Sequence, residues 1–457
     1  MIHRTHVSRF LWLAVLSACS VSIDGEQAER DRAKTLGARY EKPFADRELP
    51  PLQPDSDLAA WIAHAESSNG ELEAAYYEWL AAIEEVPQAA TQDTTAMIGL
   101  EHTLDGGSAL DRTGLMLMTD TMANWVLPGR LRDRGHAALL RARAAGSVFV
   151  TRRLALQREV AERSIELAMR DREIELQERL LRSLGVAAAS ARAQVQSGQA
   201  SQRESVTAET EQLRAQAMLV QLRQGRPALV AELLATAGVA MPSALDPAPS
   251  LPELAPLRAE ELATLDAAIA HNPSLLEARA RHEAVLAQIT ADEWEHMPQF
   301  SLRSLLMGDG TAMLQPAMTL PFLRDHAISA KLRASRAAAD GAAAMLRQEG
   351  LDAAATILAE RARHDAAVAE AAVLRDQVLP RLQRTALVAR GEWTASRAQL
   401  RDWLEIDNTA TAVELELVRL QGTAAITRAR LLAALGSALT APLEATTAES
   451  LPTGVVR

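Results

Sequence analysis

Side chains able to perform catalysis or to hold a metal ion are sparse and poorly spaced in this chain of 457 residues. The chain has ten histidines, and His271, His282 and His296 are separated by 11 and 14 residues. Two imidazoles share one face of a helix when they are three or four residues apart. The sequence also has no glycine-rich phosphate loop, so ATP hydrolysis would have to come from a partner. We therefore expect no enzymatic activity, no bound metal and no cofactor.

Cys19 is the only cysteine of the chain, and its surroundings indicate a specific modification. Two arginines and a short apolar run, residues 10–16, precede it in the layout of a secretory signal that is too short to span a bilayer. The sequence Leu16-Ser17-Ala18-Cys19 resembles the bacterial lipoprotein signal, in which the cysteine is lipidated and becomes the first mature residue. The alternative is an ordinary signal with a chance cysteine, or a buried thiol. The resemblance, with Ser20 after the cysteine, implies anchoring in the outer membrane.

Composition excludes several classes of protein. A net charge of -11 opposes a general role on nucleic acid, where basic side chains supply most of the affinity. No run of 18 or more apolar residues is present, so we expect no membrane-spanning helix. Aromatic residues make up only 3% of the chain while alanine is abundant, which suits closely packed helices.

Two long helical hairpins organise the chain, because the stretch from Pro128 to Gly238 is repeated from Pro321 to Gly436. In each copy a long run of helix formers is followed by a turn and by a second helical run that ends in a glycine. The turn and the glycine are 40 residues apart in both copies, from Gly198 to Gly238 and from Ser396 to Gly436. A continuous helix from Pro128 to Gly198 would be about 100 Å long.

The long helices carry further signals. In the first, Leu167, Ile174 and Leu181 recur every seven residues, and a second leucine series recurs every four. These two adjacent apolar stripes predict that the helix packs against neighbours on two sides. In the second, Pro380 removes an N–H group and should kink or break the helix about four turns before the tip of the hairpin.

Alternation of apolar with mostly polar side chains predicts two strand hairpins, one before each long helix. The predicted length of about ten residues is what a tilted strand needs to cross a bilayer. Trp125 and Phe322, near the strand ends, would suit a membrane interface. Two soluble hairpins packed on helices fit the alternation equally well. The four predicted strands are residues 95–104, 114–125, 299–307 and 311–320.

The remaining segments complete two structural repeats. Residues 20–56 are polar and then rich in proline, so with Cys19 they are interpreted as an extended, lipid-anchored tether. Asp57 is placed to cap a helix that stops before Pro87. Five prolines mark a linker between the repeats. The predicted divisions are residues 1–18 (signal peptide), 19–56 (N-terminal segment), 57–240 (first repeat, helical hairpin at 130–238), 241–258 (linker), 259–438 (second repeat, helical hairpin at 322–436) and 439–457 (tail).

Together these features resemble the TolC family of outer-membrane efflux and secretion channels. The resemblance covers residues 57–438 and lies in the lipidated cysteine, the helix start Asn272-Pro-Ser-Leu275, the steps from strand hairpin into Leu-Pro, Pro380 and the tip-to-glycine spacing. It implies a mainly α fold with a minor antiparallel β part. Three protomers would pool four strands each into a twelve-stranded transmembrane β-barrel, continuous with a periplasmic α-helical barrel. Four strands cannot close a barrel in lipid, which independently requires assembly.

The resemblance implies the outer-membrane channel of a tripartite efflux system of the RND type, a passive exit duct for small molecules or metal ions. The implied partners are two further copies of the chain as a homotrimer, a periplasmic adaptor protein, an inner-membrane pump and outer-membrane lipid. Alternatives are a lipid-anchored periplasmic coiled-coil adaptor without a pore, and a protein-secretion duct of the same fold. The duplication of both hairpin and strands favours the duct, because an adaptor would carry one helical hairpin in a small β-rich module.

Channels of this family often carry acidic residues six and nine places after the tip glycine, where they line the closed end. Here those places hold Glu204 and Thr207 in the first hairpin, and Asp402 and Glu405 in the second. Ser201 with Glu204 also forms a capping-box pattern, so helix capping is the alternative role. The tip residues expected to contact the adaptor are Gly198, Ser201, Ser396 and Arg397.

Overall fold

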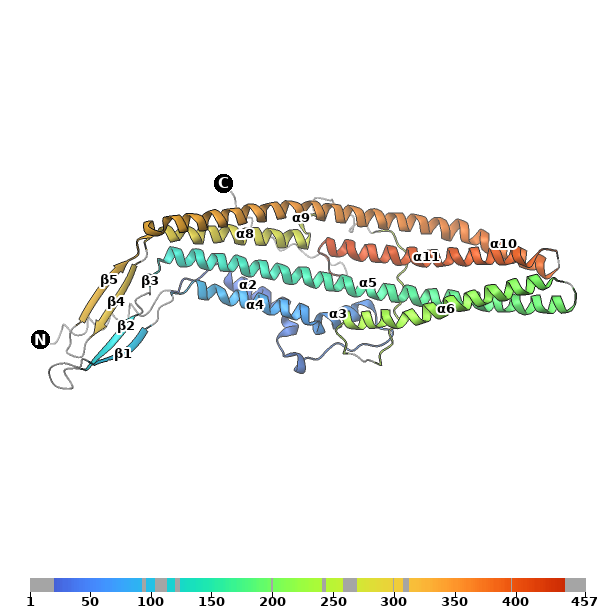
Figure 1. Cartoon of the computed structure of the whole chain (residues 1–457), viewed down its shortest axis with the longest axis horizontal. Coiled ribbons are helices and arrows are strands. Elements are labelled where there is room, and N and C mark those ends of the chain that lie inside the picture. The colour runs from blue at the N-terminus through green and yellow to red at the C-terminus, as the bar shows by residue number, and fades with distance from the viewer. Residues whose placement is uncertain are drawn as a thin grey trace. The chain divides into compact units, whose positions relative to one another are not determined.

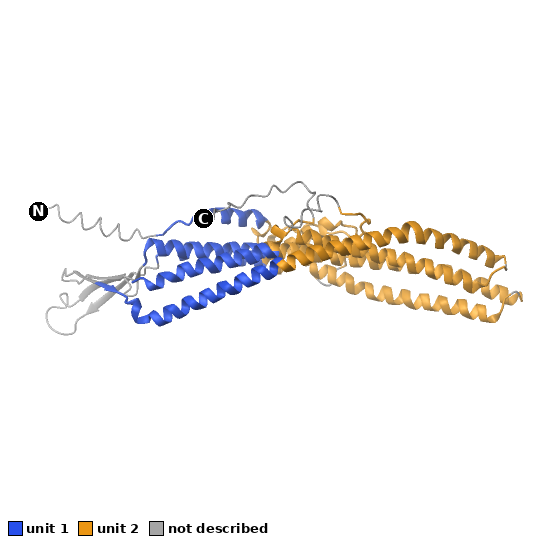
Figure 2. Cartoon of the chain, turned by 90° about the horizontal axis from the view of Figure 1, so that it is seen from above, with its two compact units in different colours: residues 1–38, 74–149, 274–350 blue, residues 39–73, 150–273, 351–457 orange. Residues whose placement is uncertain are grey.

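The structure is a computed structural model that describes residues 20–92, 96–102, 113–119, 124–198, 200–240, 244–257, 269–298, 300–306, 312–395 and 397–439. Cys19, Ser396 and the C-terminal tail lie outside these residues. The chain divides into two compact units (Figure 2). The first comprises residues 1–38, 74–149 and 274–350, and the second comprises residues 39–73, 150–273 and 351–457.

Helix α5, Pro128–Gln196, is continuous over 69 residues. A proline opens it at the first helical position, where the missing N–H would have no partner within the helix. Helix α6, Gln202–Thr236, returns antiparallel beside it (Figure 1). Ion pairs join the two helices, with Arg226 2.5 Å from Asp171 and Arg223 2.6 Å from Glu178. The run of helix formers after Pro128 thus folds into the first long hairpin.

The second hairpin contains a helix that Pro380 does not break. Five residues shortly before Pro380 adopt the wider π-helical pattern, and the chain continues as α-helix on both sides of them. A proline ring clashes with the carbonyl four residues earlier and offers no N–H, and a turn widened by one residue accommodates both defects. The elements are α9, Asp325–Val373, the π segment, Leu374–Val378, α10, Leu379–Thr394, and α11, Leu400–Ala434.

Both hairpins end in the same left-handed glycine motif. Gly238 has a φ of 72° and Gly436 a φ of 71°. After α6, the N–H of Val239 donates to the carbonyl of Leu234 at 2.9 Å, and the N–H of Gly238 donates to Ala235 at 3.0 Å. Equivalent bonds of 3.0 and 3.1 Å follow α11. These bonds satisfy carbonyls that a helix end leaves without partners.

Replacing Gly238 by alanine is expected to destabilise the protein by about 1–2 kcal/mol, because an L-residue adopts the left-handed conformation at that cost. The new Cβ would also lie 3.0 Å from the backbone of Ser68. The matched control is Gly341→Ala in α9, where a Cβ meets open space, and which should stabilise the protein by up to about 1 kcal/mol. Thermal unfolding in detergent, followed by circular dichroism, measures both. Equal losses at the two sites would contradict the assigned cause.

The strands combine the two repeats in the first unit. Strands β1 and β2 pair antiparallel, and β3, β4 and β5 form a second sheet in that order, with β2 lying beside β4. Strand β3 follows the first hairpin in sequence and pairs with β4 of the second. The described residues of the predicted strand 114–125 thus belong to β2 and β3, which pair with different partners. The strands are β1, Ala96–His102, β2, Thr113–Thr119, β3, Asn124–Trp125, β4, Phe300–Leu306, and β5, Ala312–Met318.

Residues 20–56 are not the extended tether predicted from their prolines and polar side chains. They contain helix α2, Glu26–Leu36, and short 3-10 turns at Ala38–Tyr40 and Phe44–Asp46. Ile23 is buried in the first unit, where Gly135 of α5 lacks the Cβ that would collide with it. Burial of apolar side chains thus orders a segment whose composition alone suggests a linker.

Helix α3, Leu58–Ser68, starts as predicted, with the Asp57 carboxylate accepting from the N–H of Ala60 at 2.8 Å. The prediction of one helix that stops before Pro87 is wrong. The chain turns at Asn69, which accepts from the N–H of Leu72 at 3.0 Å and starts α4, Gly70–Ala89. Pro87 is tolerated because it lies close to the end of α4, where few bonds depend on it.

The second repeat has helix α8, Pro273–Glu293, before its strands, followed by a 3-10 turn at Trp294–His296. A further 3-10 turn, Pro321–Arg324, leads into α9. No helix in the described ranges combines the length and the hydrophobicity that crossing a lipid bilayer demands.

Candidate functional site at the hairpin tips

The first tip turns through Gly198, whose φ is 76°. Nothing lies within 4 Å of a Cβ built on this glycine, so the backbone conformation rather than crowding requires it. Ser201 occupies the N-cap position of α6, but its side chain makes no capping hydrogen bond, and the predicted capping box is wrong. The N–H of Glu204 donates instead to the backbone carbonyl of Ser201 at 3.0 Å. This backbone hydrogen bond takes the place of the capping bond to the Ser201 hydroxyl.

The second tip joins α10 to α11. The N–H of Arg397 donates to the carbonyl of Glu392 at 2.8 Å, which closes the end of α10, and the Arg397 side chain is exposed. Gln399 occupies the N-cap position of α11. Ser396 lies outside the described residues, so its role at the tip stays a prediction.

The predicted acids lie in the first turns of the two returning helices. Glu204 is half-buried on α6, and the neighbouring Thr207 is exposed. Asp402 and Glu405 are both exposed on α11. Exposed carboxylates suit either a water-filled pore or a solvated helix start, so their role in lining a pore stays a prediction.

A buried apolar cluster holds the two hairpins together behind the tips. Helices α5 and α6 contribute mainly alanines, and α10 and α11 contribute the large side chains that fill the space between them. Small residues on one side let the helices approach closely and receive the larger side chains of the other. The buried members are Leu184, Ala187, Ala188, Ala191, Ala208, Ala215, Ala389, Trp393, Leu400, Trp403 and Leu404.

Two tryptophans form the centre of this cluster. The rings of Trp393 in α10 and Trp403 in α11 stack with centroids 5.1 Å apart and an angle of 13° between their planes. The guanidinium of Arg390 lies 5.9 Å from the Trp403 ring, within the range of a cation–π contact. The stack ties the start of α11 to the end of α10, on either side of the second tip.

Helix α5 contacts two neighbours in the second unit, as its two apolar stripes predict. Besides its ion pairs to α6, it forms polar contacts with α11 along its length. The hairpin helices therefore lie in the order α6, α5, α11 and then α9, which continues as α10. Both α9 and α10 pack on α11. The contacts from α5 to α11 are Glu162 to Arg430 at 2.8 Å, Glu173 to Arg419 at 3.5 Å, Arg179 to Glu414 at 3.2 Å and Ser183 to Asp407 at 3.1 Å.

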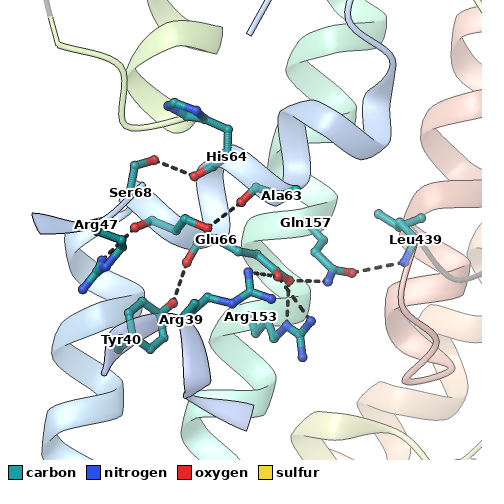
Figure 3. A network of polar contacts seen from close by, with 11 residues as sticks. Arg39, Tyr40, Arg47, Ala63, His64, Glu66, Ser68, Arg153, Gln157 and Leu439 are labelled. Atoms are coloured by element: carbon teal, nitrogen blue, oxygen red, sulfur yellow. Dashed lines mark hydrogen bonds and ion pairs between the residues drawn. The ribbon is translucent and has the colours of Figure 1, made fainter. Parts of the chain in front are cut away.

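A buried carboxylate supports this arrangement away from the tips (Figure 3). Glu66 of α3 is 3% exposed, and its Oε1 accepts from Arg153 Nε and Gln157 Nε2 of α5, both at 2.6 Å. Arg39 forms an ion pair with the other carboxylate oxygen. The hydroxyl of Tyr40 donates to the backbone carbonyl of Glu66 at 2.6 Å. The network therefore joins the N-terminal segment, α3 and α5.

Burial alone would raise the pKa of Glu66, but the hydrogen bonds and positive charges around it outweigh burial. Arg153, Gln157 and Arg39 together hold the pKa of this carboxyl below its ordinary value. Gln157 also accepts the N–H of Leu439 at 3.1 Å through its Oε1. One side chain thus links the carboxylate to the last residue that the structure describes.

Sequence reasoning missed Trp403 and Glu66 as structural residues. Trp403 stands with Leu400 and Leu404 at helical spacing, a signal for a buried stripe next to the tip. Glu66 follows Ala65 on a short apolar helix, and an acid in such a position needs a partner when it is buried. Over the described ranges, no group of three or more His, Cys, Asp or Glu side chains could hold a metal ion.

Comparison with known proteins places this geometry in a class. Comparisons with protein-family models and with curated proteins found no match. Solved structures that align over most of this chain include outer-membrane channels. The chain therefore has the fold of an outer-membrane channel, and the mainly α part of the fold expected from the TolC resemblance is confirmed, while the trimer and its β-barrel stay a prediction.

Among the similar structures, the outer-membrane channel OprN aligns with a TM-score of 0.72 at 16% identity, over 87% of this chain and 98% of OprN. The outer membrane protein VceC of Vibrio cholerae aligns with a TM-score of 0.71 at 18% identity, over 83% of this chain and 96% of VceC. The open state of the Neisseria gonorrhoeae channel MtrE gives a TM-score of 0.72 at 18% identity, over 84% of this chain and 89% of MtrE.

Proposed function

We propose that this protein is the outer-membrane exit duct of a tripartite efflux system, anchored by a lipid on Cys19. It forms a homotrimer, extends into the periplasm and meets a periplasmic adaptor that is coupled to an inner-membrane pump. Small molecules or metal ions pass through it without chemical change. The fold supports this proposal, and the observation that carries it is that one protomer leaves both its sheets and its helical hairpins with unpaired edges.

The edges of the sheets are the first part of that observation. Among the described strands, β1 pairs only with β2, and β5 pairs only with β4. In a bilayer each unpaired backbone N–H or carbonyl costs several kcal/mol, because lipid offers no hydrogen-bond partner. Pairing of β1 in one copy with β5 in the next would remove both edges and close a barrel.

The outer helices of the second unit are the second part. On α6, Val206, Leu213 and Val220 recur every seven residues, and they are 54%, 65% and 46% exposed. They lie opposite the face of α6 that packs on α5. At the other edge, Leu351 and Leu358 of α9 are 67% and 51% exposed, opposite the face that packs on α11. Two different apolar edges on one protomer fit a ring in which each copy meets the next head to tail.

Reconstitution of the purified protein into planar bilayers tests the proposal. We expect discrete conductance steps and a trimer in detergent, measured by light scattering. A lipid-anchored adaptor without a pore would give no conductance at any protein concentration, and a stable monomer would also contradict the proposal.

The exposed acids of the second tip give a further prediction. The double variant Asp402→Asn with Glu405→Gln should lower the ratio of cation to anion permeability, because three copies would lose a ring of negative charges. A carboxylate 4 Å from a cation in water contributes about 1 kcal/mol, so we expect a change of about fivefold. Reversal potentials in a salt gradient measure it. Glu370→Gln, an exposed acid on α9, is the control and should leave the ratio unchanged.

A further inference from the structure

Two buried polar side chains of α9 each keep one atom without a hydrogen bond. Glu360 is 6% exposed and His364 is 1% exposed, and the two lie one turn apart on the same face of the helix. Within the described part of the chain, Oε2 of Glu360 and Nδ1 of His364 are enclosed and have no hydrogen-bond partner. Such atoms are rare in folded proteins, because folding removes the water that would otherwise bind them.

Neighbouring side chains of α9 leave the two atoms unsatisfied. Arg363 donates to the other oxygen of Glu360, Oε1, at 2.6 Å, and its side chain is 61% exposed. An oxygen of Asp365 lies 3.6 Å from Nδ1 of His364, which is longer than a hydrogen bond, and this side chain is 58% exposed. Both neighbours are therefore hydrated, and neither completes the bonding of the buried atoms.

The polar side chains that α11 brings to this level bind elsewhere. Thr427 is 3% exposed, and its hydroxyl is within hydrogen-bond distance of two carbonyls of its own helix, at 2.8 and 3.0 Å. Arg430 pairs with Glu162 of α5 at 2.8 Å. The charge of Arg430 also attracts Glu360, but Oε2 receives no hydrogen bond from it.

Apolar clusters lie on both sides of this polar section, along the same contact between α9 and α11. Toward the hairpin tip, two alanines of α9 pack with Leu420 and Ala424 of α11. In the opposite direction, Ile357 of α9 packs with Leu431 of α11. The contact is therefore apolar, then polar, then apolar again, and its middle section is the least stabilised.

We infer that this section is a weak point built into the second hairpin, at which α9 separates locally from α11 while the clusters on both sides stay closed. Separation lets water bind Oε2 of Glu360 and Nδ1 of His364, which offsets part of the packing that is lost. Local opening in proteins begins where stabilising contacts are few. The inference goes beyond the proposed function, and it can be tested whether or not the protein conducts. In a channel, such a section would let the wall yield at one level rather than along the whole hairpin.

Hydrogen–deuterium exchange of the full-length protein in detergent, followed by mass spectrometry, tests the inference. Backbone amides of residues 357–364 should exchange faster than those of residues 160–168, a largely buried stretch of α5 in the same unit. The double variant Glu360→Leu with His364→Leu removes both unsatisfied atoms. It should slow exchange at 357–364 about tenfold, because apolar side chains leave no hydrogen bond unmade there. It should also raise the midpoint of thermal unfolding by about 2–4 °C.

The matched control is Asp292→Leu, which removes a buried acid that has its partners. Asp292 is 6% exposed and accepts from Gln288 at 2.9 Å and from Ser335 at 3.0 Å. Its replacement should lower the midpoint of thermal unfolding, because these donors lose their acceptor. An unchanged or lower midpoint in the double variant, or exchange that is not slowed, would show that the polar pair does not weaken the contact and would overturn the inference. Equal exchange of residues 357–364 and 160–168 in the unsubstituted protein would overturn it without any variant.

Discussion

Replacement of Leu213 by aspartate is expected to abolish the trimer while leaving the protomer folded. Leu213 is 65% exposed in the single chain, so the carboxylate stays hydrated there and costs little. In the assembled ring the same position would face the next copy, and a charge buried there without a partner costs several kcal/mol. A loss of about 3 kcal/mol at each contact weakens association more than about 100-fold.

Light scattering in detergent measures the loss of the trimer, and planar-bilayer recordings measure the loss of conductance. The matched control is Gln221→Asp, an exposed position of α6 about 100° around the helix from Val220 and so beside the stripe of Val206, Leu213 and Val220 rather than in it. It should remain trimeric and conduct. A trimeric, conducting Leu213→Asp protein would show that this edge of α6 does not contact a second copy.

Replacement of Glu66 by glutamine is expected to cost about 3 kcal/mol of unfolding free energy, because removal of one partner leaves the buried parts of the pair without compensation. Glu66 is the acceptor for Arg153, Gln157 and Arg39, so one substitution disturbs the N-terminal segment, α3 and α5 together. Denaturant unfolding in detergent measures the change. The control Glu175→Gln removes a carboxylate that is 60% exposed and paired only with Arg172 in the described contacts, and should change stability by less than about 0.5 kcal/mol.

The pH dependence of the two proteins should differ. The pKa of Glu66 is lower in the folded protein than in the unfolded chain. The ionised carboxylate therefore contributes its full share of the unfolding free energy above the ordinary pKa of about 4.3, and this share is lost as pH falls from there toward the folded pKa. Between pH 7 and about 5 the unsubstituted protein should therefore keep its advantage over Glu66→Gln. Below about 4 the difference between the two proteins should shrink. A constant difference down to pH 3 would show that the ionised carboxylate is not the source of the stability.

Local signals predicted the helical part of the fold well. The run after Pro128 contains no further proline up to the tip, and the helical runs before Gly238 and Gly436 end at these glycines, as their repeated spacing suggests. The duplication strengthened these predictions, because the long helical run and the spacing from turn to glycine occur in both repeats. The alternating stretches were also placed close to the observed strands, because their period distinguishes them from the helices around them.

Predictions failed where distant contacts decide the structure. The segment 20–56 is ordered by packing, with Ile23 buried in the first unit and Tyr40 buried in the second, which its composition does not reveal. Ser201 does not cap α6, because a backbone carbonyl already receives the N–H that its hydroxyl would satisfy. At the tips, the stacking of Trp393 on Trp403 depends on the alanines of another hairpin, and no local pattern contains that information.

The π segment before Pro380 sets the rotational phase of everything beyond it. An α-helix advances about 100° for each residue, so one additional residue taken up in a widened turn rotates the following side chains by roughly that angle. Upstream, the helix directs one row of side chains toward α11, and downstream it must direct Trp393 into the cluster behind the tips. Deleting a single residue from 374–378 would swing that indole to a different side while leaving the sequence of the tip intact. The orientation of Trp393 at the hairpin tip thus depends on an irregularity of the backbone some four turns away.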